Sequence, residues 1–321
     1  SLATDTGVNL LSPGKTPKTN LMFLTFFVNT IKAVHDYADL LRATIASAGN
    51  DHRLGANEAP PAIISIFIGK YLTDVLAQVE KRVGGNFDEQ DEALLKLDIH
   101  KSIPELMLDN TDRNRTSPFA FTGNKFEFRA VGSSANSSAA MTVLNTIVAD
   151  QLVKFKAEVD KLIKKGEKKD IAILTILKRY IKESKNIRFE GNGYSEEWEK
   201  EAESRGLSNI KTTPKALDFD VTEKSMDLFE RTGVFNHREA HARHEIRLES
   251  FYKKLQIEAR TMGELVNSVI IPAAISYQSK LVENVRGLKD IGMNADSYKA
   301  QMEIIADLSK HINIIKSNVD E

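Results

Sequence analysis

The hydrophobic and polar positions divide the sequence into a first part with strand and helix periodicity and a second part with helix periodicity alone. Residues 126–131 alternate between apolar and polar side chains, which predicts a strand. Residues 62–69 form an apolar, β-branched run, which predicts a strand buried on both faces. Apolar residues at helical spacing predict helices at residues 20–48 and 71–83. The pattern therefore indicates mixed α and β structure up to about residue 136, followed by a helical extension.

Residues that favour helix ends mark the boundaries of these elements. Thr19 or Asn20 is placed to cap the first helix and Gly49 to end it, while Asp170 and Thr222 are placed to cap later helices. The later helices are predicted at residues 137–165, 170–183, from 195, 222–233, 236–288 with a break or kink at Pro272, and 296–317. Their apolar spacing is not held as a heptad over several turns. We therefore expect packing within the subunit or against a neighbouring subunit rather than a coiled coil.

The composition narrows the class of protein. The 321 residues carry a formal net charge of −1, which argues against nucleic acid or an anionic membrane as the main partner. The absence of cysteine excludes disulfides, thiol catalysis and cysteine metal sites. No apolar run reaches the roughly 18 residues of a membrane span, and no signal segment opens the sequence. We expect a cytoplasmic protein, and the start at Ser1 without methionine suggests a processed or truncated product.

One glutamate and several cations converge on the strand at residues 126–131. Glu127 and Arg129 share one face of this strand, and Arg113 and Lys125 precede it together with further basic and turn residues. A carboxylate among fixed cations suits a metal–nucleotide site, because the carboxylate can hold Mg²⁺ and the cations can hold phosphate oxygens. A salt-bridged pair of strands on a solvated face explains this stretch equally well, and the stretch alone leaves both interpretations open.

A charged loop at residues 49–61 leads directly into the buried strand. It carries Asp51, Arg53 and Glu58, and a charged loop at the mouth of a buried strand is a common site geometry. Two glycines precede Glu58 in this loop and two prolines follow it, which predicts a hinged flap. The alternative is a surface loop with unpaired charges.

Three histidines follow one another on a face of the helix that begins near residue 236. His237, His241 and His244 have spacings that would allow a shared zinc ion. Glutamates and arginines flank them on both sides, which favours a solvated, ion-paired helix face instead.

Several motifs in the first part, taken together, resemble the catalytic half of glutamine synthetase, and their wording is similar to the large type III bacterial form. The motifs are Arg53-Leu54-x4-Glu58-Ala59-Pro60, an apolar strand, Arg115-x-x-Pro118, Glu127-x-Arg129, and Ala135-Asn136 at a helix start. The resemblance implies an α+β fold with an antiparallel-sheet catalytic core. It assigns residues 1–150 to the C-terminal part of the catalytic domain and residues 151–321 to a helical extension.

The resemblance implies an enzyme of nitrogen metabolism and glutamine biosynthesis. The reaction would be ATP-dependent ligation of ammonia to the γ-carboxylate of L-glutamate, through γ-glutamyl phosphate, with ATP and Mg²⁺ or Mn²⁺ as cofactors. The enzyme would be a cytoplasmic homo-oligomer of stacked rings, a dodecamer, without nucleic acid or membrane partners. Two alternatives stay open, namely a glutamate–amine ligase of the same superfamily and a non-catalytic structural or interaction relative.

The resemblance also carries roles onto individual residues. Arg53 takes the place of an arginine that binds the glutamate carboxylate, and Glu58 that of a catalytic flap glutamate. Glu127 matches a metal-binding glutamate, and Arg129 the arginine that holds the reacting γ-group.

The remaining basic residues are expected at the phosphates. Arg115 and Lys125 match positions that hold the nucleotide phosphates. The family's phosphoryl-contacting arginine falls at Asn110, so Arg113 is the candidate to replace it as a catalytic residue. The family's histidine and further metal-binding glutamates fall outside this sequence, so these residues would form about half of an active site.

Overall fold

The structure is a computed structural model that describes residues 2–14, 17, 20–54, 62–81, 116–130 and 135–320. The chain forms two compact units, Ser1–Leu248 and Glu249–Glu321. Helix α7 (Ser138–Lys164) passes through residue 150, so the first compact unit includes elements on both sides of the domain boundary expected there. That boundary, as a division of the family's domains, stays a prediction.

The helices of the first unit agree with most of the expected helix ends. Asn20, Ser195 and Thr222 each accept a backbone N–H bond as N-caps, and Gly233 ends a helix with a positive φ of 69°. The prediction that Asp170 is a cap is wrong, because Lys168 holds that position and Asp170 lies in the first turn. The helices are α1 (Leu21–Asp36), α2 (Ala38–Ile45), α3 (Ala48–Asp51), α4 (Lys70–Lys81), α7, α8 (Lys169–Glu183), α9 (Glu196–Ser204), α10 (Thr213–Leu217), the 3₁₀ turn η1 (Asp218–Val221), α11 (Glu223–Thr232) and the start of α12 (His237–Leu265).

The single helix expected over residues 20–48 is divided. Tyr37, with φ −125° and ψ 30°, separates α1 from α2 without disturbing the apolar periodicity that predicted one helix. Gly49 does not end a helix, because it lies inside α3. Ser47 begins this short helix by accepting a hydrogen bond from the backbone N–H of Asn50, so residues 49–51 are helical rather than loop.

Among the described residues, the sheet consists of three short strands, β1 (Ile66–Phe67), β2 (Phe119–Phe121) and β3 (Phe126–Phe128), in the order β1-β2-β3. β1 is parallel to β2 and β2 is antiparallel to β3, so the sheet is mixed. The antiparallel-sheet core expected from the resemblance is therefore not confirmed in the described part of the chain, which is mostly helical. β1 is shorter than predicted and stands first in the strand order, but it has a backbone partner on both sides, since Ile66 also bridges to Arg188. This position explains the apolar run around it.

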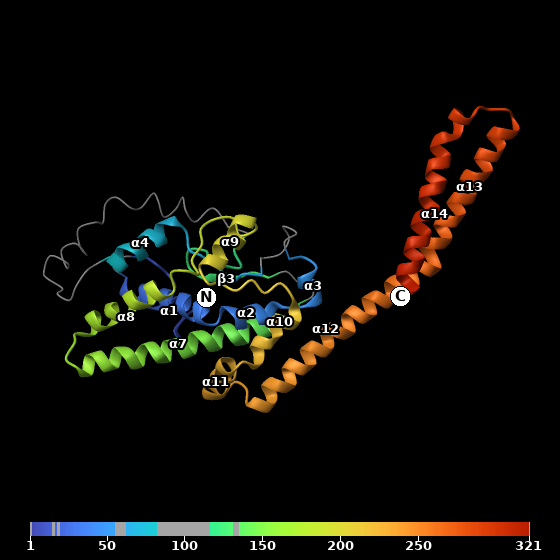
Figure 1. Cartoon of the computed structure of the whole chain (residues 1–321). Coiled ribbons are helices and arrows are strands. Elements are labelled where there is room, and N and C mark those ends of the chain that lie inside the picture. The colour runs from blue at the N-terminus through green and yellow to red at the C-terminus, as the bar shows by residue number, and fades with distance from the viewer. Residues whose placement is uncertain are drawn as a thin grey trace. The chain divides into compact units, whose positions relative to one another are not determined.

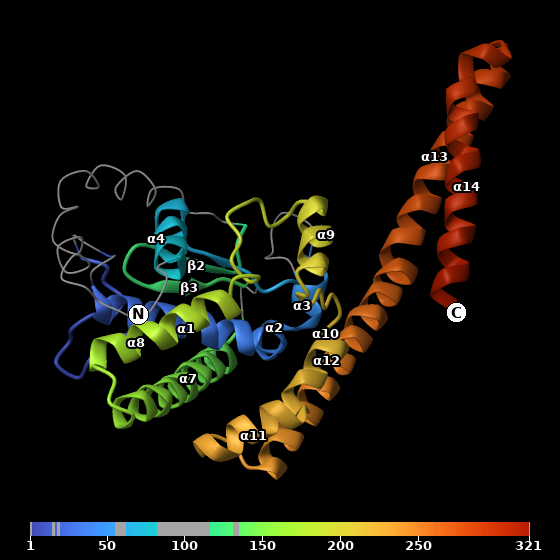
Figure 2. The ribbon, with the colours of Figure 1, turned by 60° about the vertical axis from the view of Figure 1, so that its left-hand side comes forward.

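The alternation of side chains places the sheet's aromatic residues on the face that α1 covers. Phe27 of α1 contacts Phe121 and Phe126 with ring centroids 5.0 and 5.4 Å apart, and Phe119 and Phe126 stack at 4.9 Å. α7 and α8 in turn pack on α1 and on each other, as Figures 1 and 2 show. Glu127 pairs with Ala120 in the ladder and therefore points to the other face of the sheet.

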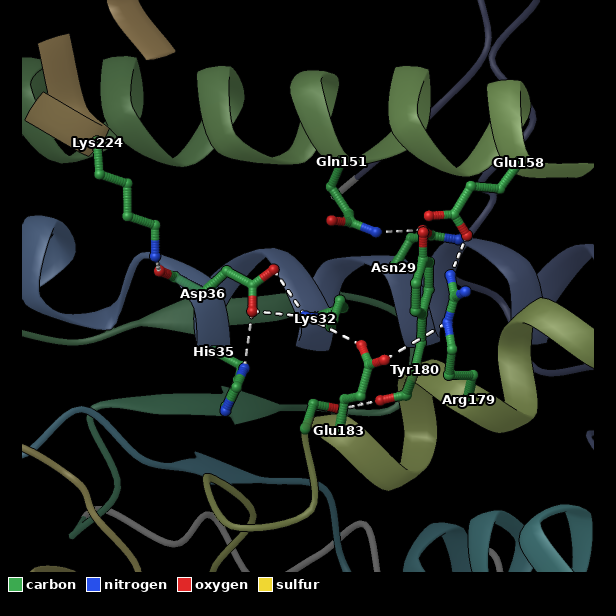
Figure 3. A network of polar contacts seen from close by, with 11 residues as sticks. Asn29, Lys32, His35, Asp36, Gln151, Glu158, Arg179, Tyr180, Glu183 and Lys224 are labelled. Atoms are coloured by element: carbon green, nitrogen blue, oxygen red, sulfur yellow. Dashed lines mark hydrogen bonds and ion pairs between the residues drawn. The ribbon is translucent and has the colours of Figure 1, made fainter. Parts of the chain in front are cut away.

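A polar network joins α1, α7 and α8 (Figure 3). The buried Asn29 accepts a hydrogen bond from Gln151 Nε2 at 3.1 Å. Lys32 bridges Asp36 at 2.6 Å and Glu183 at 3.3 Å, so one cation connects α1 with α8. Burial alone would raise the pKa of Asp36, but hydrogen bonds from His35 and Lys32 bring it below its ordinary value. Because these groups have partners on neighbouring helices, the network fixes how the helices sit on one another.

A second polar contact joins α7 to α11. Both oxygens of the nearly buried Asp150 accept hydrogen bonds from the Arg231 guanidinium at 2.8 Å, and Lys154 Nζ lies 2.8 Å from one of them. Arg231 also donates to the Tyr37 hydroxyl at 2.9 Å. Burial would raise the pKa of Asp150, but the bonds from Arg231 and Lys154 outweigh it and lower this pKa.

The Asp150→Asn substitution is expected to lower the free energy of unfolding of the first unit by about 1–3 kcal/mol at neutral pH, the range for a lost hydrogen bond to a charged group. A folded pKa below the unfolded value means that the carboxylate stabilises the fold above about pH 4 and loses this effect as the pH falls through the folded pKa. Urea unfolding of wild type and variant at pH 7, 5 and 3.5 should therefore show a difference that shrinks in acid. A difference that is the same at all three pH values would contradict this origin.

The second unit is a helical hairpin. A π-helical turn (η2, Val266–Ile270) precedes α13 (Ile271–Asp290), and Pro272 lies in the first turn of α13, which confirms the predicted break. The 3₁₀ turn η3 (Ala295–Tyr298) then leads into α14 (Lys299–Asp320), which packs against α13. Among the described residues, every helix falls short of the length or apolar character that a membrane crossing needs.

The contact between α13 and α14 has the heptad spacing that the sequence pattern did not reveal. The least exposed positions recur alternately three and four residues apart on both helices, which is the spacing of a heptad. These positions are Ile271, Ala274, Gln278, Leu281, Val285 and Leu288 on α13, and Gln301, Ile305, Leu308, Ile312, Ile315 and Val319 on α14. The packing within the subunit that the sequence predicts is found here, and exposed apolar residues outside these positions obscure the heptad spacing in the sequence.

Candidate functional site

The candidate site residues that the structure brings together lie on the β2–β3 hairpin. Its turn is closed by a hydrogen bond from Thr122 N to Lys125 O at 2.9 Å, and Gly123 adopts a positive φ of 92° there. Beyond β3, Arg129 N donates to Pro118 O at 2.8 Å and prolongs the pairing. The alternation predicted for residues 126–131 therefore holds up to Arg129, and it places Glu127 and Arg129 on one face as expected.

Glu127 is surrounded by donors on this hairpin. Arg129 Nη2 donates to Glu127 Oε2 at 2.9 Å, Thr122 Oγ1 lies 3.3 Å from Oε1, and Lys125 Nζ lies 3.7 Å from Oε1. The hydrogen bond from Arg129 is the largest effect and lowers the pKa of Glu127. Burial opposes it, but the charge of Arg129 and the contacts with Thr122 and Lys125 add to the lowering. The glutamate is therefore ionised at neutral pH, with its side chain 34% exposed.

An ionised, partly exposed carboxylate fits one oxygen ligand of a divalent cation. Within the part of the chain that the structure describes, no group of three or more histidine, aspartate or glutamate side chains could hold a metal ion. Glu127 would thus supply one ligand of the metal ion, and the other ligands would come from outside the described residues. Lys125 and Arg129, beside it, are suited to phosphate or carboxylate oxygens.

Arg53 lies elsewhere, in the exposed segment directly after α3. Asp51, two residues before it, lies in α3 and is paired, which contradicts the alternative of a surface loop with unpaired charges at this residue. Asp51 accepts hydrogen bonds from the backbone N–H and the hydroxyl of Thr213, both at 2.8 Å. Sequence reasoning missed this contact because Thr213 is 162 residues away.

Three of the predicted site residues fall outside the described residues. These are the flap glutamate Glu58, the candidate phosphoryl-contacting Arg113 and the candidate nucleotide-binding Arg115. Their roles stay predictions from the sequence.

A glycine turn supports the residue that follows Arg115. Gly193 N donates to Thr116 Oγ1 at 2.9 Å, and a Cβ added at Gly193 would lie 2.3 Å from the Thr116 carbonyl oxygen. Only glycine allows this approach, so Gly193 holds the turn at residues 191–193 against Thr116. The pair of glycines was the available signal, although the sequence does not show which segment the turn meets.

Two of the three histidines contact groups on different elements. His237 Nε2 lies 3.1 Å from Glu230 Oε2, and His244 Nδ1 lies 3.0 Å from the carbonyl oxygen of Leu217. His241 is exposed. The contact of His237 joins α12 to α11, and the contact of His244 joins α12 to the end of α10. The two histidines therefore do not share a ligand.

Comparison with known proteins identifies the family. The family described as the glutamine synthetase C-terminal domain matches residues 172–289. A glutamine synthetase of Bacteroides fragilis (strain YCH46) is 50% identical over 321 residues, which cover 98% of this chain and 44% of that protein. A type-3 glutamine synthetase of Dictyostelium discoideum is 40% identical over 319 residues, covering 98% and 43%.

A glutamine synthetase of Butyrivibrio fibrisolvens is 39% identical over 315 residues, which cover 97% of this chain and 43% of that protein. The chain thus spans less than half the length of each of these relatives. The similarity extends over both compact units, because almost the whole chain is covered each time. The chain belongs to the glutamine synthetase family and is similar to a type-3 member over nearly its whole length.

Proposed function

We propose that the protein to which this chain belongs ligates ammonia to the γ-carboxylate of L-glutamate at the expense of ATP and yields L-glutamine. The observation that carries this proposal is the 50% identity to a glutamine synthetase over nearly the whole chain. The hairpin geometry supports it, since Lys125, Glu127 and Arg129 form a cluster of one carboxylate and two cations, and such groups can hold a metal ion and stabilise the charge of a transferring phosphate. ATP and glutamate are supplied in the cytoplasm, which is the proposed location.

The proposed reaction has two steps that balance in atoms and charge. An oxygen of the γ-carboxylate attacks the terminal phosphorus of ATP, so γ-glutamyl phosphate forms and ADP leaves. Ammonia then attacks the carbonyl carbon, the carbon–oxygen bond to phosphate breaks, and phosphate departs with the former carboxylate oxygen and takes up the proton that the nitrogen loses. Arg53 would bind the glutamate carboxylate, and Arg129 would hold the reacting γ-group, because a guanidinium stays charged and matches a planar carboxylate.

Mg²⁺ or Mn²⁺ would neutralise charge on the transferring phosphate when bound. Glu127 would supply one of its carboxylate ligands, and Lys125 and Arg115 would hold the nucleotide phosphates. Arg113 would contact the transferring phosphoryl group. The lowered pKa of Glu127 favours this role, since a metal ligand must be deprotonated.

The reaction is tested by supplying the full-length protein with glutamate, ATP and Mg²⁺, together with either ammonium or an organic amine such as ethylamine. We expect glutamine and ADP in equal amounts with ammonium and little product with ethylamine. A γ-glutamyl amide formed preferentially from ethylamine would indicate a glutamate–amine ligase instead. A folded protein that forms neither product would indicate a non-catalytic relative.

We further propose that the protein is a homo-oligomer of stacked rings, a dodecamer, in which the second unit contacts other subunits. Large apolar side chains are exposed on this unit. Exposed apolar surface of this kind marks sites of protein–protein contact, because burying it against a partner is favourable. The residues more than half exposed are Tyr252, Ile257, Met262, Leu265, Val269, Tyr277 and Ile291.

Deleting residues 249–321 from the full-length protein should therefore reduce the size of the oligomer while the first unit stays folded, since the two units are compact separately. Solution scattering gives the particle size, and circular dichroism reports the remaining fold. A deletion variant with the native oligomer size would refute this role.

A further inference from the structure

The segment that presents Arg53 begins with a helix too short to be rigid by itself. α3 has four residues, and a single helical turn has little stability without outside contacts. Arg53 follows it directly and is exposed. Whatever holds α3 therefore determines where the Arg53 guanidinium lies.

Asp51, the last residue of α3, provides the first of these contacts. One carboxylate oxygen accepts from Thr213 N and the other from Thr213 Oγ1, both at 2.8 Å. Thr213 is 1% exposed and begins α10, so the backbone N–H that Asp51 binds has no partner within that helix. The carboxylate thus closes a two-point contact between α3 and α10.

Arg42 of α2 completes the joint from the other side. Its side chain is 1% exposed and donates to Ile210 O at 3.0 Å and to Asn50 Oδ1 at 3.2 Å, and Nη2 lies 3.6 Å from Asp51 Oδ1. Burial lowers the pKa of Arg42 and Asp51 opposes this effect, but arginine remains charged in proteins. Ala46, Ala216 and Leu217 pack together beside these groups. α2, α3 and α10 are therefore held together by polar and apolar contacts at once.

We propose that Asp51 is a positioning residue that holds Arg53 in place for glutamate by clamping Thr213. This inference rests on the proposed function. α10 lies within the matched C-terminal domain, so that domain sets the position of a substrate-binding arginine that lies before it in the sequence. A displacement of about 1 Å is enough to weaken the bond between the Arg53 guanidinium and the glutamate carboxylate, and a loosened α3 would allow it.

The test uses three variants of the full-length protein. In Asp51→Asn, the amide nitrogen cannot accept a hydrogen bond, so one bond to Thr213 is lost. Thr213→Val removes only the hydroxyl donor at nearly constant shape, and Thr213→Ser restores it. We expect Asp51→Asn and Thr213→Val to raise the KM for glutamate by about tenfold, the scale of one bond to a charged group. The kcat and the KM for ATP should change less than twofold, and Thr213→Ser should behave like wild type.

Asp150→Asn is the matched control, because it also removes a nearly buried carboxylate that joins two helices, but neither helix carries a candidate site residue. It should lower stability and leave the KM for glutamate unchanged. Calorimetry with L-glutamate measures binding directly and should show the same order of variants. A folded Asp51→Asn protein with wild-type glutamate binding and KM would overturn the clamp while the proposed function stands. A wild-type protein that neither binds glutamate nor forms glutamine would overturn both.

Discussion

Glutamine formation should fall by roughly 10²-fold or more when Glu58 is replaced by glutamine in the full-length protein, the usual scale for a lost general base. The proposed role of Glu58 is to attract ammonium by its charge and then accept a proton, which leaves ammonia as the nucleophile. Glutamine keeps the shape of the side chain and removes both the charge and the base. ATP binding should change little, because the proposed role involves no contact with the nucleotide.

The residues that flank Glu58 predict that its loop can close over the site. Gly55 before the glutamate and Pro60 and Pro61 after it predict a hinged flap that keeps water from the acyl phosphate. Gly49 takes no part in such a hinge, since it lies within α3. Glu58→Asp, which retains a shorter carboxylate, is the matched control and should keep more activity than Glu58→Gln. A normal rate for Glu58→Gln at neutral pH and low ammonium would exclude the base assignment.

Replacing Glu127 by glutamine should raise the Mg²⁺ concentration needed for half-maximal ATP turnover by at least about tenfold and reduce the rate at limiting metal. Metal affinity commonly falls by roughly 10- to 100-fold when a group that supports a metal ligand is changed, so a change of the ligand itself should cost at least about tenfold. The neutral amide is a poorer ligand, and it also loses the charge-assisted bond from Arg129. Steady-state rates over a Mg²⁺ titration measure the effect.

The competing interpretation is that Glu127 only forms a salt bridge with Arg129 on a solvated strand. It predicts a modest loss of stability with an unchanged metal requirement, because exposed ion pairs contribute little. Thr122→Val is the matched control, since it removes the 3.3 Å contact to Glu127 and leaves the charge in place. If Glu127→Gln and Thr122→Val show the same metal dependence as wild type, the ligand role is wrong.

Local features of the fold could be predicted from the sequence because short stretches determine them. Thr222 and Gly233 mark the ends of α11 through a side-chain acceptor and a left-handed backbone, and both ends are where the sequence placed them. The alternation at residues 126–128 likewise placed Glu127 opposite the aromatic face. The resemblance to glutamine synthetase rests on motifs of the same local kind.

Features that depend on distant partners could not be predicted in this way. The parallel pairing of β1 with β2 and the clamp between Asp51 and Thr213 join segments that no local pattern relates. Gly193 carried a local signal, but its partner Thr116 lies 77 residues away. The position of Arg53 relative to the β2–β3 hairpin could not be predicted either, because Arg53 and the hairpin lie far apart in the sequence.

The central claim is that this chain belongs to an enzyme that makes glutamine through γ-glutamyl phosphate, and the fate of one oxygen atom tests it most directly. The full-length protein is supplied with ammonium, ATP, Mg²⁺ and glutamate labelled with oxygen-18 in its γ-carboxylate. Phosphorus nuclear magnetic resonance of the released phosphate then reports the label. The account predicts one labelled oxygen in each phosphate, with glutamine formed in equal amount. Unlabelled phosphate, or labelled phosphate without glutamine, would contradict it.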